Sequence, residues 1–170
     1  MDSKIKMNYF TRQWWFFDSV LCDFDNDAHF QEYFNHVDQL VDAGVPVPDD
    51  LRNPCSTHDY QVTRVLIDKE SFSFVLRDPE HWVPYLLRFE KPSSVTCTDH
   101  QNGDEYISFQ VMNLVGAGVG YAEYENLCGQ GYRYSMIFDR DFTIAIELET
   151  EIVFRRISTD EAEDHEVPLV

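Results

Sequence analysis

Lysine and arginine are absent from long stretches of this chain. Neither occurs from Gln13 to Leu51, where nine acidic residues lie, and neither occurs from Pro92 to Tyr132. The 170 residues include 31 Asp and Glu against 13 Lys and Arg, which gives a formal net charge of −18. Nucleic acids and anionic lipid surfaces are bound through clustered basic side chains. The sequence therefore predicts no nucleic-acid or membrane partner, and favours a protein with a basic surface.

Cysteine is also scarce, and its spacing matches neither a zinc motif nor a dense disulfide framework. The four cysteines are Cys22, Cys55, Cys97 and Cys128. No apolar run approaches the ~20 residues that cross a bilayer. The apolar patch near the N-terminus is interrupted by Arg12 and Asp18 and has no small-residue cleavage site after it. We expect reduced, mostly buried thiols in a cytoplasmic protein, with no metal and no cofactor.

Aromatic residues are abundant, whereas basic residues and cysteines are scarce. Hydrophobic residues make up 44% of the chain and aromatic residues 15%, a composition typical of a globular protein. The length fits one domain. After Ser158 the chain is acidic and has no apolar periodicity. We therefore expect a single domain over residues 1–157 and a mobile acidic tail over residues 158–170.

The clearest element is a helix from about Asp27 to Ala43. Its apolar residues fall in one arc of the helical projection: Phe30, Tyr33, Phe34, Val37, Leu40 and Val41. Asn26 or Asp27 provides an N-cap, and Gly44 followed by Pro46 marks the end. Asp38 and Asp42 lie on the opposite face, four residues apart, without a basic partner nearby in sequence. That face either is a solvated acidic surface or docks against lysines and arginines of a partner.

From Tyr60 onward, apolar residues recur at every second position, which is typical of β-strands. The predicted strands are residues 62–68, 72–76, 85–89 with a continuation to 97 past Pro92, 107–111, 132–138, 142–148 and 152–157. A glycine cluster at 116–120 lies between two of them and predicts a turn or bulge. Short connections favour antiparallel pairing. We expect an α+β fold in which the N-terminal amphipathic helix packs on a curved, mainly antiparallel sheet of about six to eight strands.

The last part of the sheet carries a suggestive acidic pattern. Glu147, Glu149 and Glu151 lie at every second position of a run whose even positions are apolar except Thr150, so an uninterrupted strand would place them on one outer face, roughly 6.8 Å apart. Such a row of carboxylates resembles the charges of a nucleic-acid backbone. Alternatively, cross-strand neighbours such as Arg155 and Arg156 neutralise it.

Other motifs favour ordinary structural roles. Asp23, Asp25 and Asp27 resemble the start of a calcium loop, but Ala28 and Phe34 replace the Gly and Glu that the loop requires. These aspartates complement the helix dipole instead. His29 and His36 share a helix edge at a spacing that does not favour zinc. His58-Asp59 and the run from Asp78 to His81 contain acid–base residues, yet no nucleophile motif accompanies them.

In general character the chain resembles the immunity proteins of bacterial polymorphic-toxin and contact-dependent inhibition systems. The resemblance lies in the aromatic segment NYFTRQWWFFDSV, the acidic helix HFQEYFNHVDQLVDAG and the terminal strands YRYSMIFDRDFTIAIELETEIVFRRI. It implies a protein that is not an enzyme and that neutralises a cognate toxin domain, often a basic nuclease. The predicted partner-binding residues are Asp23, Asp25, Asp38, Asp42, Glu147, Glu149 and Glu151.

Two other functions remain open at this point. A nucleic-acid mimic that inhibits a restriction or CRISPR-type enzyme would carry the same acidic charge, and a small hydrolase would use paired carboxylates in catalysis. Whichever protein partner binds, exposed aromatic residues among the acids would anchor it, with Tyr106, Tyr121 and Tyr124 as the candidates.

Overall fold

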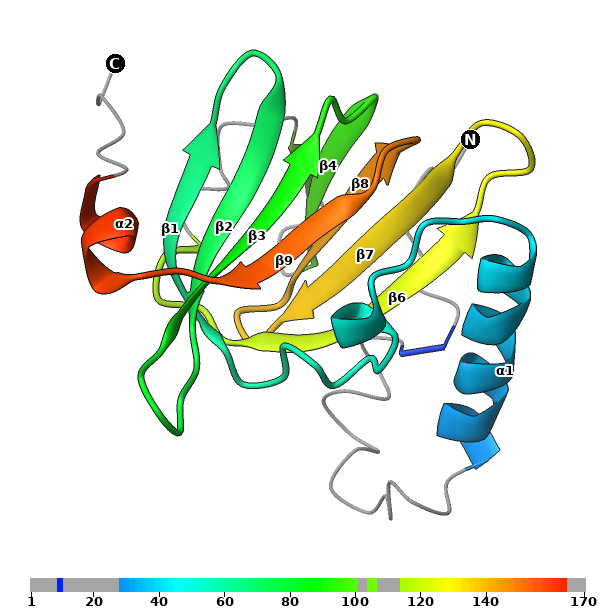
Figure 1. Ribbon diagram of the computed structural model, residues 1–170, viewed down its shortest axis with the longest axis horizontal. Coiled ribbons are helices and arrows are strands. Elements are labelled where there is room, and N and C mark those ends of the chain that lie inside the picture. The colour runs from blue at the N-terminus through cyan, green and yellow to red at the C-terminus, as the bar shows by residue number, and fades with distance from the viewer. Residues whose placement is uncertain (1–8, 11–27, 101–103, 107–113, 165–170) are drawn as a thin grey trace.

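The computed structural model describes residues 9–10, 28–100, 104–106 and 114–164, and this part of the chain forms two antiparallel sheets with two α-helices beside them (Figure 1). The first sheet has four strands in the order β1-β2-β3-β9, and the second has five in the order β5-β4-β8-β7-β6. The α+β class predicted from the sequence is confirmed. The expectation of one sheet is wrong, because the strands divide between two.

The element bounds agree with most of the sequence pattern. The strands are β1 (Gln61–Ile67), β2 (Ser71–Arg77), β3 (Pro84–Glu90), β4 (Ser94–Asp99), β5 (Asp104–Tyr106), β6 (Val119–Asn126), β7 (Tyr132–Phe138), β8 (Phe142–Leu148) and β9 (Ile152–Arg156). The helices are α1 (Ala28–Asp42) and α2 (Thr159–Asp164), with a 3₁₀ turn, η3 (Asp49–Leu51). The strand expected at 107–111 lies outside the described residues.

The two sheets share one aromatic core. Phe74 of β2 lies 6.0 Å from Phe138 of β7, and Phe89 of β3 lies 5.8 Å from Tyr134, measured between ring centroids. The chain passes from the first sheet to the second at Lys91 and Pro92. Lys91 has a left-handed backbone with φ of 45°, and Pro92 cannot donate to a ladder hydrogen bond. The predicted continuation of β3 past Pro92 is therefore wrong, and β4 belongs to the other sheet.

Helix α1 lies along the free edge of β6. The backbone N–H of Tyr124 donates to the hydroxyl oxygen of Tyr33 (3.1 Å), and Nε2 of His36 donates to the carbonyl oxygen of Tyr124 (2.9 Å). The N–H of Ala122 donates to Pro54 O (3.2 Å). An unpaired edge invites pairing with other chains, and these contacts satisfy it. The helix thus covers an edge, whereas the sequence predicted that it would cover a sheet face.

Helix α2 occupies the start of the predicted mobile tail. Its Ala162 packs against a small apolar cluster on the outer face of the first sheet, formed by Val75, Leu86 and Ile157. The hydroxyl of Ser158 accepts the backbone N–H of Glu161 (3.0 Å), which caps the helix start. Residues 159–164, which the sequence assigned to a mobile acidic tail, form a helix that this cap and this apolar contact stabilise.

Candidate functional site

Helix α1 and strand β6 run side by side in the same direction. Phe30, near the start of α1, lies 6.1 Å from Tyr121 between ring centroids. One turn later, Tyr33 and His36 bond to Tyr124. The C-terminal part of α1, which carries Asp38 and Asp42, therefore lies near the end of β6 (Figure 1). Both aspartates are exposed, on the face opposite the buried stripe, as the sequence predicted.

The turn after β8 lies at the same end of the molecule. A Cβ atom on Gly131, in the β6–β7 turn, would clash with the carbonyl oxygen of Leu148 and lie 3.0 Å from Cγ of Glu149. The hydroxyl of Tyr132 donates to the carbonyl oxygen of Thr150 (2.6 Å). Carboxylates from α1, β6, β8 and the β8–β9 turn thus gather at one end. We call this surface the acidic end: Asp38, Asp42, Glu125, Glu147, Glu149 and Glu151.

Arg133 of β7 holds two of these carboxylates. Its Nη1 lies 2.8 Å from Glu125, and its Nη2 lies 2.6 Å from Glu147. Burial alone would lower the pKa of Arg133, but the hydrogen bonds and charges of Glu147 and Glu125 raise it above its usual value. Glu125 and Glu147 are therefore fixed in place, whereas Glu149 and Glu151 are exposed.

The three glutamates do not form the row that alternation along one strand predicted. Strand β8 ends at Leu148, so only Glu147 belongs to it, and Glu149 and Glu151 lie in the turn before β9. The chain bends here because Gly131 allows close approach and because the hydroxyl of Thr150 donates to Glu90 O (2.6 Å). The neutralising partner of Glu147 is Arg133, while Arg155 pairs with Glu161 instead.

The remaining predicted residues have mixed outcomes. Asp23 and Asp25 lie outside the described residues, as does the side chain of Tyr106. Tyr121 and Tyr124 are each 1% exposed, so the prediction that they anchor a partner is wrong. Their position among acidic residues predicted exposure, but β6 is buried on both faces over most of its length. Among the residues that the structure describes, the exposed aromatic residue is Trp82, at 65%.

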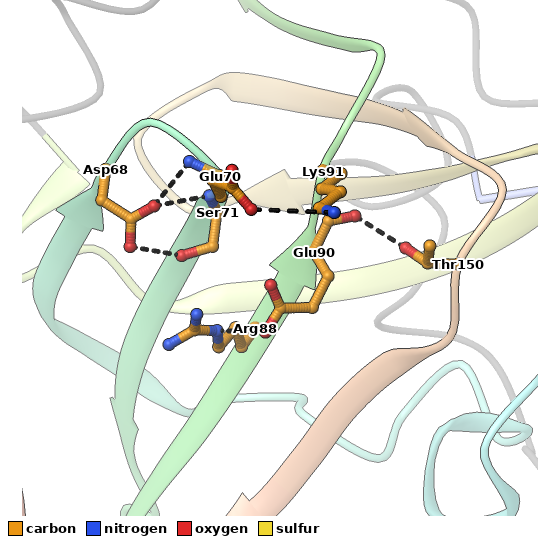
Figure 2. Close-up of polar contacts among 7 residues, drawn as sticks. All are labelled: Asp68, Glu70, Ser71, Arg88, Glu90, Lys91 and Thr150. Atoms are coloured by element: carbon orange, nitrogen blue, oxygen red, sulfur yellow. Dashed lines mark hydrogen bonds and ion pairs between the residues drawn. The ribbon is translucent and has the colours of Figure 1, made fainter.

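A cavity of about 500 Å³ borders the acidic end, between the β1–β2 turn and the β3–β4 connection (Figure 2). Asp68 closes the β1–β2 turn by accepting three hydrogen bonds of 2.7 Å, from the N–H of Glu70 and from the N–H and hydroxyl of Ser71. These hydrogen bonds lower the pKa of Asp68, so its carboxylate is committed to the turn.

Two lysines line the same cavity. The backbone N–H of Lys91 donates to Glu70 O (2.6 Å), and its ammonium group lies 3.7 Å from the carboxylate of Glu70. Lys69 is exposed on the turn itself. Phe72 and Val95 contribute apolar walls. These contacts join the hairpin to the β3–β4 connection, and the lysines limit the acidic surface on this side.

Two histidines and two cysteines have structural settings. His29 and His36 contact the backbone carbonyls of Tyr9 and Tyr124. Burial raises the pKa of the Cys55 thiol to about 12 and that of Cys97 to about 11, so both are protonated and weakly nucleophilic at neutral pH. In the described ranges, no three or more His, Cys, Asp or Glu side chains are grouped to hold a metal ion.

None of the helices in the described part of the chain combines the length and apolarity needed to cross a bilayer. No protein-family model matches the sequence, and no curated protein matches it.

Proposed function

We propose that this protein is a cytoplasmic immunity protein that acts by binding, not by catalysis. The acidic end docks onto a basic surface of a cognate bacterial toxin domain, of nuclease type, and so neutralises it. The observation that carries the proposal is the convergence of helix and turn carboxylates on one end of the molecule. A surface of one charge steers an oppositely charged partner and raises the association rate to as much as ~10⁸–10⁹ M⁻¹s⁻¹ at low salt.

The acids of α1 support a binding role because their positions do not favour the helix. Asp38 and Asp42 are four residues apart, a spacing at which like charges repel. They also lie near the C-terminus of α1, where the helix dipole disfavours negative charge. The first turn of α1, where acids would stabilise the helix, has none. Helix stability alone therefore does not account for Asp38 and Asp42, although Asp27, directly before α1 in sequence, is placed to complement the dipole.

The turn geometry favours an immunity protein over a nucleic-acid mimic. A mimic that inhibits several unrelated enzymes needs carboxylates that follow the repeat of a phosphate backbone. Glu147 is paired with Arg133, and Glu149 and Glu151 leave the strand. Carboxylates in such an irregular arrangement match the surface of one partner and not of others. An immunity protein needs this specificity, because it must recognise one toxin.

The test compares two variants of equal net charge after the native partner has been isolated by affinity purification. The acidic-end variant carries Asp38→Asn, Asp42→Asn, Glu149→Gln and Glu151→Gln. The control variant carries Asp50→Asn, Glu80→Gln, Asp160→Asn and Glu163→Gln, at exposed acids elsewhere. We expect the acidic-end variant to associate about tenfold or more slowly at low salt, to lose most of its salt dependence and to stay folded. The control variant retains near-native kinetics.

Four outcomes would contradict the proposal. Equal slowing in both variants would mean that overall charge, not the acidic end, attracts the partner. Unchanged kinetics in the acidic-end variant would place the interface elsewhere. Recovery of a partner without a basic surface would remove the basis of the toxin assignment, and inhibition of several unrelated nucleic-acid enzymes would favour the mimic.

A further inference from the structure

A second cavity, of about 310 Å³, lies at the opposite end of the strands. Arg133, which holds two carboxylates of the acidic end, lies near the start of β7, whereas Asp139, directly after β7, lines this cavity. Five strand residues lie between Arg133 and Asp139, which places the two about 20 Å apart along the strand. The β2–β3 turn, which supplies another wall, lies away from the β6–β7 turn (Figure 1). The volume is near the lower limit for ligand pockets and suits a single long side chain.

Trp82 forms an exposed wall of this cavity. Its backbone has a φ of 58°, a left-handed conformation that is unusual for a bulky residue. The β2–β3 connection holds it there, with Trp82 N–H donating to Asp78 O and Asp78 N–H donating to Val83 O, each at 3.0 Å. The indole remains 65% exposed. Tryptophan is among the residues that most often dominate binding energy at interfaces.

The glycine cluster forms part of the opposite wall. A Cβ on Gly118 would lie 2.9 Å from the carboxylate oxygen of Asp139, so a larger residue would displace that carboxylate. Gly116 also lines the cavity and has a φ of 87°, a conformation that glycine adopts readily. The cluster predicted as a turn therefore also allows a carboxylate to lie against bare backbone at the cavity wall.

The charges of the cavity favour a cation, and one buried donor lacks an acceptor. Asp59, Asp78 and Asp139 line the cavity together with Arg77. The Arg77 guanidinium lies 5.6 Å from the centroid of the Trp82 ring. Its Nε is buried and, among the described residues, has no hydrogen-bond partner. Buried donors are nearly always satisfied, by protein, water or ligand, and a peptide carbonyl is a suitable acceptor.

We propose that this cavity, the Trp82 pocket, binds a lysine or arginine side chain from an extended segment of a protein partner. The aliphatic part of that side chain packs on the exposed indole, and its cationic group faces Asp59 and Asp139. Arg77 Nε donates to a backbone carbonyl of the same segment. Aromatic faces and carboxylates both attract cations. The proposal is independent of the acidic end, which lies at the other end of β7.

The test uses short peptides and the NMR signal of the Trp82 indole N–H, assigned with a Trp82→Phe variant. Acetyl-Gly-Arg-Gly-amide is titrated into the ¹⁵N-labelled full chain to about 10 mM, because a single side chain binds weakly. We expect saturable shifts of the Trp82 indole and of the amides at Gly116 and Gly118. The citrulline peptide, which has the same shape without the charge, should shift these signals far less at equal concentration.

Single substitutions test which carboxylates attract the arginine side chain. Asp139→Asn and Asp59→Asn should each weaken binding of the arginine peptide about threefold, as expected for partly exposed charge pairs. Glu32→Gln, at an exposed acid of α1 outside both surfaces, should leave it unchanged. Equal shifts with the citrulline peptide, tighter binding of acetyl-Gly-Glu-Gly-amide, or no saturable shift would each overturn the proposal. Tighter binding of the glutamate peptide than of the arginine peptide would instead indicate an anion site centred on Arg77.

Discussion

At the scale of single residues, the shape of the acidic end depends on Gly131. This glycine has a φ of 86° and lies directly against Leu148 and Glu149. Without its close approach the β6–β7 turn and the β8–β9 turn would separate, and the carboxylates of Glu149 and Glu151 would lie farther from those of α1. The absence of a side chain at Gly131 thus determines how close the carboxylates of the β8–β9 turn lie to those of α1.

Gly44 provides a matched control for a test of this close approach. It has the same φ of 86°, but a Cβ there would meet nothing within 4 Å. Gly44→Ala should lower the free energy of unfolding by about 1–2 kcal/mol, because only the left-handed conformation is penalised. Gly131→Ala should lower it further, since steric overlap with the Leu148 carbonyl adds to the same penalty. Denaturant unfolding measures both values, and equal losses would show that the turns do not need the contact.

At the scale of elements, α2 shows how a short helix is stabilised by its cap and its contacts. Six residues cannot form a stable helix alone. Ser158 caps the start, Arg155 pairs with Glu161, and Arg64 donates to the carbonyl oxygen of Glu163 (3.0 Å). Ala162 then covers the apolar cluster on β2 and β3. Each contact is small, and together they order the segment.

We therefore expect Ser158→Ala to lower the free energy of unfolding by about 1 kcal/mol, because the N–H of Glu161 loses its acceptor. Ser158→Gly should cost only a few tenths of a kcal/mol, since glycine leaves the end of the helix open to water. Denaturant unfolding compares the two variants. Hydrogen exchange should show faster exchange at Ala162 in Ser158→Ala, and unchanged exchange there would mean that α2 does not depend on its cap.

Elements with a clear apolar periodicity in the sequence were predictable, whether one face is buried, as in α1, or both, as in β7. The stripe from Phe30 to Leu40 gave α1 to within about a residue at each end, an agreement within the usual uncertainty of helix boundaries. Strands β1, β7 and β8 were found because β-branched and aromatic residues alternate along them. Strand β6 was missed because Gly120 and the buried Glu123 interrupt its apolar alternation, and because its ladder shifts between Val119 and Ala122.

Other features of the fold could not be predicted from the periodicity of apolar residues. The division into two sheets depends on the left-handed Lys91 before Pro92, a conformation that a sequence pattern does not specify. The pairing of Arg133 with Glu125 and Glu147 depends on strand register, which long-range contacts determine. Helix α2 did have a local signal, the Ser158-Thr-Asp-Glu161 run that is typical of a helix start.

At the scale of the whole molecule, a net charge of −18 opposes folding, because a compact chain brings like charges together. Local ion pairs act in the opposite direction, and salt weakens both effects. Raising the ionic strength from 0.01 M to 0.15 M shortens the Debye length from about 30 Å to about 8 Å. Long-range repulsion is therefore screened strongly, whereas half-buried pairs such as Arg133–Glu147 are screened much less.

We accordingly expect sodium chloride to raise the unfolding temperature over this range. The acidic-end variant should show a smaller rise than the control variant, although both have lost four negative charges, because repulsion is strongest where carboxylates crowd together. Thermal unfolding followed by circular dichroism measures the slope. Equal slopes would show that repulsion is spread evenly over the surface. A fall in unfolding temperature with salt would mean that attractive pairs dominate, and the acidic end would then carry no excess repulsive field with which to attract a basic partner.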